Sequence, residues 1–276
     1  MLLKTVLKNH LLIVILALLA GLNACQTPTA PSGQQAGGDS LSKDSIAQNV
    51  KEVVYPLPAP FELTQMLNDM GAAYVGKNLN PVNKVEKYVT EKDKAVNLGV
   101  YGADLAYATT YNKEEDVKAY LKAVRTLIDA LGVNIDYSPL FSDEVKMKAN
   151  NKDTLVEIIT NTFYATYSSL KEKNSPEMAV MMVSGMWIEL MYIATHISKD
   201  TYNNTQIVTL IAKQKDSYEK LMNLIENYPN HQALKDLDEK LSVLKPVFAK
   251  VDQGLTVSDY NLLLSTIEKV RKGFVL

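Results

Sequence analysis

The pattern of apolar and polar positions changes along the chain, from one apolar block near its start to a helical period from Phe61 onward. In the second region apolar residues recur every three or four positions, as on one face of an α-helix. One such stripe comprises Val117, Tyr120, Leu121, Val124, Leu127, Ile128 and Leu131. No stretch alternates with period two, and Asn-Gly and Asp-Gly hairpin turns are absent. The sequence therefore predicts an all-α fold, an irregular multi-helix array or bundle of about nine or ten helices built from antiparallel hairpins.

Residue types that favour helix ends divide this region. Thr90, Asn112 and Thr154 each resemble an N-terminal cap, because an acid follows three positions later. Ser175-Pro176 is a further start signal, since proline is favoured at the first helical position. The candidate helices, of which about nine or ten are expected to form, lie at residues 43–53, 61–75, 81–88, 91–110, 113–131, 143–150, 153–173, 176–198, 201–227, 231–253 and 257–272.

The runs at 201–227 and 231–253 nearly keep a seven-residue apolar repeat. Only Tyr228-Pro229-Asn230 separates them, so an antiparallel hairpin with coiled-coil-like packing is expected. Pro246 should kink the second run, because proline removes a helical hydrogen bond and clashes with the preceding turn.

Residues 178–197 form the most apolar internal segment, with Glu189 as the only formal charge in twenty residues. Its length would allow a membrane span. However, Ser184, Thr195 and His196 are polar, and no basic clusters flank the segment. The composition favours a central helix that is buried on most sides.

Glu189, Tyr192 and His196 lie on one face of this expected helix, at helical spacing. In one interpretation they line a ligand cleft, with Glu189 as an acid, a base or a hydrogen-bond acceptor. In the other, Glu189 is a structural residue whose carboxylate forms hydrogen bonds with Tyr192, with a neighbouring lysine or with backbone. Apolar surroundings should raise the pKa of such a carboxyl group or demand a partner for it.

A second candidate segment, residues 97–108, contains Gly99 and Gly102 inside an expected helix. Glycine destabilises a helix by roughly 1 kcal/mol relative to alanine, so a close crossing of two helices is the simpler explanation for both. The alternative is that Asp104, one turn from a tyrosine on either side, faces a cavity. The complete candidate ligand cleft comprises Glu189, Tyr192, His196, Tyr101, Asp104 and Tyr107.

The first 25 residues have the layout of a removable bacterial signal. Lys4 and Lys8 precede an apolar run from Leu11 to Leu19, and Leu22-Asn23-Ala24-Cys25 follows. The run is about half the length that a membrane helix needs. The pattern resembles the lipobox of bacterial lipoproteins, which implies cleavage before Cys25 and attachment of lipid, including palmitate, to its thiol. The expected domains are a signal peptide (1–24), a lipidated flexible tether with a possible short helix (25–54) and a single all-α domain (55–276).

Composition excludes several classes of function. The formal charge is −2, and removal of residues 1–24, which hold two lysines and no acid, makes it −4, so no basic patch for nucleic acid is expected. An acylated Cys25 leaves no other cysteine, and only His196 and His231 remain after the signal. Glu189 and His196 lie seven residues apart, roughly 10 Å along a helix, which is too far to share an ion. No catalytic residue, metal or cofactor is predicted, and phosphate-loop, dinucleotide and serine-hydrolase motifs are absent.

The lipobox, polar tether and helical body together resemble the all-α lipoproteins of Bacteroidota that have no assigned activity. The resemblance covers the whole layout, but only the first 25 residues carry a specific motif. It implies a lipid-anchored position in the bacterial cell envelope, at the outer membrane, with the periplasmic or surface face left open. The first hypothesis is a non-catalytic helical module that binds an envelope protein or a small-molecule or glycan ligand. The alternative is a hydrolase or lyase that uses Glu189 and Asp104 in an interhelical cleft.

Overall fold

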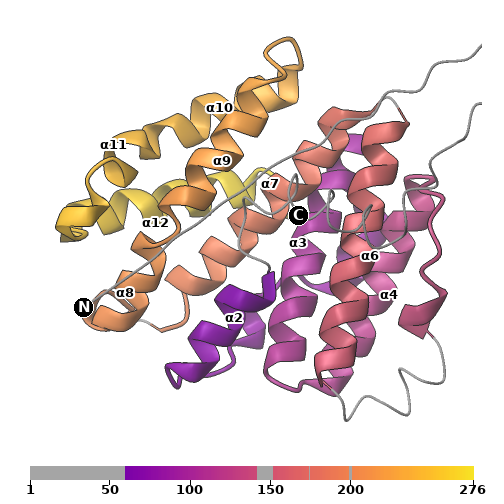
Figure 1. The fold of residues 1–276 in the computed structure, drawn as a ribbon, viewed down its shortest axis with the longest axis horizontal. Coiled ribbons are helices and arrows are strands. Elements are labelled where there is room, and N and C mark those ends of the chain that lie inside the picture. The colour runs from indigo at the N-terminus through magenta and orange to yellow at the C-terminus, as the bar shows by residue number, and fades with distance from the viewer. Residues whose placement is uncertain (1–59, 142–151, 174, 199–200) are drawn as a thin grey trace, which may run out of the picture. The chain divides into compact units, whose positions relative to one another are not determined.

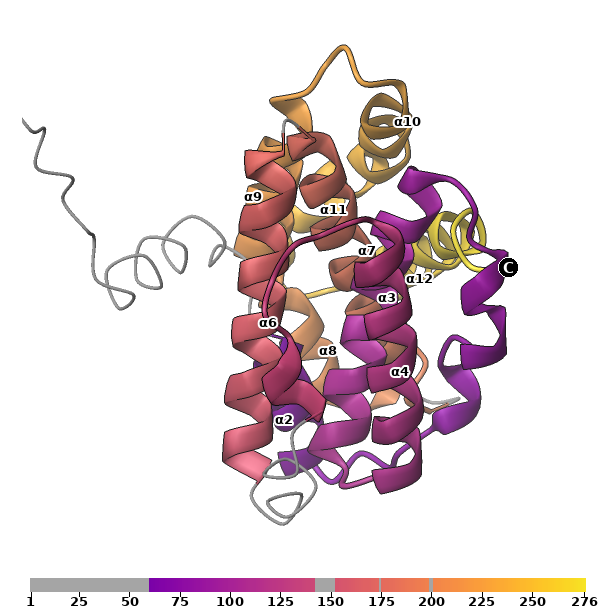
Figure 2. The same cartoon turned by 90° about the vertical axis from the view of Figure 1, so that its right-hand side faces the viewer.

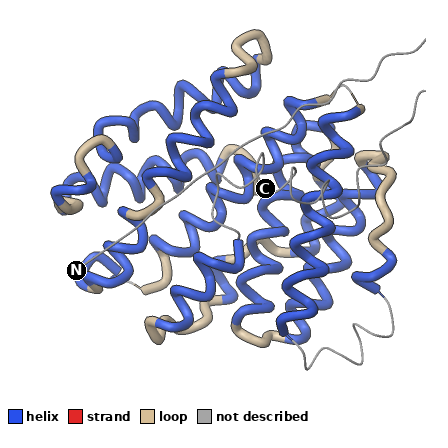
Figure 3. The backbone as a smooth tube through the Cα atoms, viewed as in Figure 1, coloured by secondary structure: helices blue, strands red, loops and turns tan. Residues whose placement is uncertain are grey.

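The computed structural model describes residues 60–141, 152–173, 175–198 and 201–276, which all belong to one compact unit. Within these ranges the chain is helical and has no strand, so the all-α prediction is confirmed (Figure 3). The α-helices are α2 (Pro60–Asp69), α3 (Glu91–Thr110), α4 (Glu114–Ala130), α6 (Lys152–Glu172), α7 (Pro176–Thr195), α8 (Thr205–Ala212), α9 (Lys215–Glu226), α10 (Gln232–Leu241), α11 (Lys245–Phe248) and α12 (Val257–Lys272). Short 3₁₀ turns occur at Gly76–Asn78, Val82–Lys87, Ser138–Phe141, Thr201–Asn203, Ser242–Leu244 and Val251–Gln253. The expected helices at 43–53 and 143–150, Cys25 and the tether lie outside the described residues.

Helix α7 is the central element. It contacts α2, α3 and α6 on one side and α8, α9 and α12 on the other (Figure 1). Helix α7 is long and apolar enough to cross a membrane, but 89% of its most apolar window is buried inside the protein. The prediction of a central buried helix is therefore confirmed.

Helix α3 is the second central element, and its burial was not expected. All of its residues from Ala95 to Thr110 are buried, although several are polar. It packs most extensively against α7 and also contacts α4, which lies beside it in both views (Figures 1 and 2).

Two glycines let α3 and α7 touch through their backbones. A Cβ atom on Gly99 would lie 1.8 Å from the carbonyl oxygen of Met182, and one on Gly185 would lie 2.1 Å from that of Val96. A Cβ atom on Gly102 would lie 2.2 Å from the Phe163 ring of α6, so this glycine makes room for a side chain rather than for a backbone. The interpretation as a close helix crossing is confirmed for Gly99, whereas Gly102 accommodates the Phe163 ring.

The capping signals had mixed outcomes. Thr90 caps α3, its hydroxyl accepting from the backbone N–H of Asp93, as predicted. The prediction of Asn112 as an N-terminal cap was wrong, because α4 starts two residues later. Asn112 instead follows the end of α3 with a φ of 53°, a conformation that asparagine tolerates. The prediction of Thr154 as an N-terminal cap was also wrong, because α6 already begins at Lys152. Pro176 is the first residue of α7, as expected, but Ser175 makes no side-chain capping bond.

The two expected long C-terminal helices are broken. Residues 201–227 form a 3₁₀ turn, α8 and α9, because Asn204 caps a new helix by accepting from the N–H groups of Gln206 and Ile207. Residues 231–253 form α10 and α11 with 3₁₀ turns, and Pro246 lies in the first turn of α11, so it separates helices rather than kinking one. The α9–α10 hairpin is confirmed: Tyr218 Oη, near the start of α9, donates to the Leu241 carbonyl at the end of α10, at 2.8 Å.

The α3–α7 contact predicts a large effect for one added methyl group. Gly99→Ala should lower the free energy of unfolding by at least about 3 kcal/mol, the upper range for overpacking, because the obstructing atom is a backbone oxygen. Urea unfolding followed by circular dichroism measures the change. Gly273→Ala is the control, since its nearest obstructing atom is 3.2 Å away and its φ is −77°. Equal stability of the two variants would contradict the backbone contact.

Candidate functional site

A buried ion pair joins α7 and α12. Glu189 has no exposed side-chain surface and Arg271 only 12%. Nε of Arg271 donates to Oε2 of Glu189 at 2.6 Å and Nη2 donates to Oε1 at 2.7 Å, so the pair is bidentate. Nη2 also donates to the carbonyl oxygen of Asn78 at 3.0 Å, and the guanidinium lies 4.0 Å from the centre of the Tyr192 ring.

Asp104 lies beside this pair without a cation of its own. Its Oδ2 accepts from the backbone N–H of Asn80 at 3.1 Å, and Oδ1 has no partner among the described protein atoms. Burial is the main cause that raises the pKa of Asp104 well above 3.8, and the negative charge of Glu189 adds to it, while Arg271 and the Asn80 N–H oppose it. The buried surroundings therefore favour the protonated form of the Asp104 carboxyl group over its charged form.

The buried tyrosines hold the irregular segment 73–81 against α3 and α4. Tyr107 Oη accepts from the N–H of Val75 and donates to the carbonyl of Ala73, at 3.0 and 3.1 Å. Tyr101 Oη donates to the carbonyl of Pro81 at 3.0 Å, and Tyr120 Oη donates to that of Asn80 at 3.2 Å. These bonds satisfy backbone groups that have no helical partner, so the tyrosines stabilise the position of segment 73–81.

His196 follows the last residue of α7 and is bound on both ring nitrogens. Nε2 lies 2.9 Å from Oε1 of Glu268, and Nδ1 lies 2.8 Å from the carbonyl oxygen of Tyr192. The ring stacks on Tyr192 with its centroid 3.9 Å away. Since both nitrogens already face acceptors, His196 has no vacant nitrogen for a general base.

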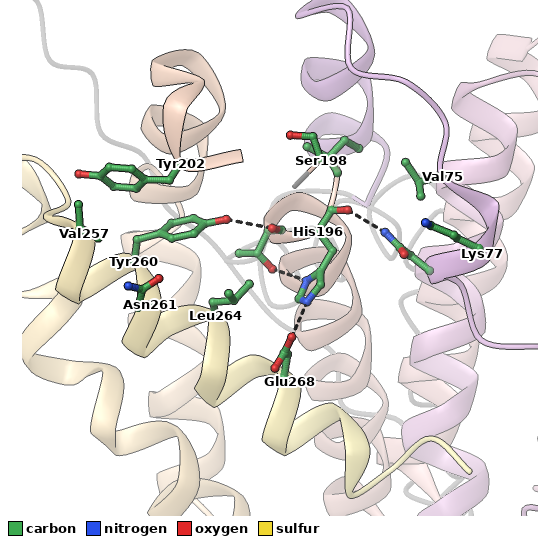
Figure 4. A pocket seen from close by; sticks show the side chains of 13 residues that line it. Val75, Lys77, His196, Ser198, Tyr202, Val257, Tyr260, Asn261, Leu264 and Glu268 are labelled. Atoms are coloured by element: carbon green, nitrogen blue, oxygen red, sulfur yellow. Dashed lines mark hydrogen bonds and ion pairs between the residues drawn. The ribbon is translucent and has the colours of Figure 1, made fainter. Parts of the chain in front are cut away.

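A pocket of about 590 Å³ opens beside His196 (Figure 4). Residues 75–78, the end of α7, the 3₁₀ turn at Thr201–Asn203 and α12 form its walls. Lys77, Asn78, His196, Tyr202, Leu264 and Glu268 are among the lining residues.

The six residues of the expected cleft do not share one opening. Tyr101, Asp104, Tyr107 and Glu189 are buried and do not line this pocket. Tyr192 is half-buried between Arg271 and His196, and of the six only His196 lines the pocket. The solid core around Glu189 favours the structural interpretation, although its partner is Arg271 rather than Tyr192 or a lysine.

Sequence reasoning missed the residues that complete this arrangement, namely Arg271, Asn80 and Glu268. Arg271 and Glu268 stand in the expected helix 257–272, but no local pattern relates Arg271 to Glu189, 82 positions earlier. Among the described residues, no three or more histidine, aspartate or glutamate side chains gather as a metal site would require. Comparison of the chain with protein-family models, curated proteins and solved structures found no match.

Removal of one partner of the ion pair should be strongly destabilising. Glu189→Ala should lower the free energy of unfolding by about 3–5 kcal/mol, because it leaves Arg271 buried without its carboxylate. Thermal and urea unfolding at neutral pH measure the loss. Glu115→Ala, which breaks the exposed pair with Lys118, should leave the melting temperature nearly unchanged. A Glu189→Ala variant as stable as its parent would instead place Glu189 in a functional cleft.

The raised pKa of Asp104 predicts a pH dependence. When a folded-state pKa exceeds the unfolded one, the folded protein binds more protons between the two values, so stability falls as pH rises through that interval. Asp104→Asn mimics the neutral carboxyl group and should remove this slope, at most about 1.4 kcal/mol per pH unit for one proton. Denaturant unfolding measures the free energy of unfolding at each pH. Between pH 5 and pH 8 this free energy should therefore fall less for Asp104→Asn than for the parent. Identical losses would mean that Asp104 is ionised across this range.

Proposed function

We propose that this protein is a lipid-anchored, non-catalytic binding module of the bacterial cell envelope, attached to the outer membrane through Cys25. The anchor is supported by the basic start at Lys4 and Lys8, the short apolar run and Leu22-Asn23-Ala24-Cys25. The polar residues that follow would separate the membrane from the helical body.

The bidentate Glu189–Arg271 pair is the observation that carries the non-catalytic part of the proposal. Glu189 is fully buried and both of its oxygens are bound, so it cannot transfer a proton to a substrate without unfolding of the core around it. Asp104 is equally buried. The alternative, a hydrolase or lyase that uses these two carboxylates, lacks an accessible acid or base.

Binding is supported by the pocket beside His196. Its volume of about 590 Å³ lies within the usual range for small-molecule sites, about 300–1,000 Å³. The walls combine aromatic and aliphatic side chains, including Tyr202 and Leu264, with the polar groups of Lys77, Asn78 and Glu268. A small ligand rather than a flat protein surface suits this shape. No basic surface for nucleic acid is part of the proposal.

The anchor can be tested in cells that process lipoproteins. Cys25→Ser should abolish labelling by a clickable palmitate analogue and leave an uncleaved precursor, because the thiol at position 25 is the only one in the chain. Ser40→Ala, in the polar segment, serves as the control and should be labelled like the parent. Labelling of Cys25→Ser would overturn the lipoprotein assignment.

A further inference from the structure

The pocket beside His196 presents one positive and one negative group whose hydrogen-bonding capacity is not filled. Lys77 is exposed at the pocket wall and makes no ion pair with a described residue. Glu268 uses Oε1 for His196, and none of the described residues donates to its Oε2. Figure 4 shows the ammonium group of Lys77 directed toward the His196 side of the pocket and Glu268 below the imidazole ring.

The two charges come from different elements that are held in fixed relation. Asn78 Nδ2 donates to the carbonyl oxygen of His196 at 2.8 Å, so residues 77–78 are fixed at one side of His196. Glu268 contacts the ring of the same histidine from α12. A ligand beside His196 therefore meets Lys77 and Glu268 as separate partners that come from different elements of the pocket wall.

The remaining wall is apolar and aromatic. Tyr260 donates its hydroxyl to the carbonyl of Thr195 at 2.9 Å and Tyr202 donates to that of Leu255 at 3.3 Å, so both hydroxyls are already occupied and the rings offer mainly apolar surface. Leu264 and the exposed Val257 extend this surface. The Asn261 side chain adds an amide at the rim (Figure 4).

We infer that the pocket binds a short peptide with apolar side chains, whose terminal carboxylate pairs with Lys77 and whose terminal ammonium pairs with Glu268. The inference rests on the proposed binding function and names its ligand class. A dipeptide to tetrapeptide separates its termini by up to roughly 7–14 Å, at about 3.5 Å per residue, so its two ends can reach groups on different elements, and the pocket volume of about 590 Å³ leaves room for it. Its backbone amides can bond to Asn78 and Asn261, and its side chains can lie on Tyr202 and Leu264.

The test uses the full-length protein in detergent and four forms of the tripeptide Ala-Leu-Ala. Isothermal titration calorimetry compares the free, N-acetylated, C-amidated and doubly blocked peptides. Each single block should weaken binding by roughly two- to fivefold, the size expected for an ion pair with a solvent-exposed group, and the double block should weaken it further.

Two variants assign the termini. Lys77→Gln should weaken binding of the free peptide but not of the C-amidated one, and Glu268→Gln should weaken binding of the free peptide but not of the N-acetylated one. Lys269→Gln and Glu239→Gln, both exposed and outside the pocket, are the charge-matched controls and should bind like the parent. Leu264→Trp, which fills the apolar wall, should abolish binding of all four forms.

The outcomes separate this inference from the proposed function. Equal binding of all four peptides, lost in Leu264→Trp, would overturn recognition of the termini while the binding module stands. Absence of binding of any form by a folded parent protein would overturn the peptide inference. The palmitate labelling of Cys25 tests the proposed lipid anchor independently of both binding results.

Discussion

The backbone contact between α3 and α7 is the constraint on which the rest of the structure depends. Because Gly99 and Gly185 leave no side chain between the two helices, their backbones touch and further elements cover both helices. Polar residues that a surface helix would expose to water are consequently buried. A buried polar group needs a partner from the protein, so Glu189 and Asp104 dictate what must pack against them. Arg271 and the backbone of Asn80 supply those partners.

The ion pair also restricts how α12 can dock. Burial of two charges has a large desolvation cost, so the pair need not add net stability relative to apolar residues of the same volume. Its geometry is nevertheless demanding, because successive residues of an α-helix point about 100° apart and a shift of α12 by one residue would turn Arg271 away from Glu189. Burial and the nearby charge of Glu189 both raise the pKa of Asp104, because an ionised Asp104 would place a second negative charge beside a single arginine, Arg271. The polar core thus has chemical groups typical of an active site, and the bonds of Glu189, Arg271 and Asp104 Oδ2 join α3, α7, α12 and segment 73–81.

Sequence alone predicted those parts of the fold that depend on local signals. Helices α3 and α12 have the predicted bounds, since Thr90 caps α3 and the apolar period of α12 ends at its basic last turn. The runs at 201–227 and 231–253 were wrong as continuous helices, because an apolar repeat records which side chains face the core and not whether the backbone between them stays helical. Among the candidate residues, Glu189 and Asp104 were rightly recognised as unusual. Their roles depended on Arg271 and Asn80, which approach only after folding and leave no signal in the local sequence.

The polar core and the pocket are separate sites that share one helix turn. Arg271 and Glu268 are three residues apart on α12, so they lie on one face, and the first completes the core while the second lines the pocket. Between them, the Tyr192 ring has the guanidinium of Arg271 on it and the His196 ring stacked against it. Arg271 therefore helps to position the pocket wall, together with the bonds from Tyr260 to Thr195 and from Glu268 to His196. The buried Glu189–Arg271 pair thereby helps to fix the position of the groups that line the pocket, because Arg271 and Glu268 stand on the same helix.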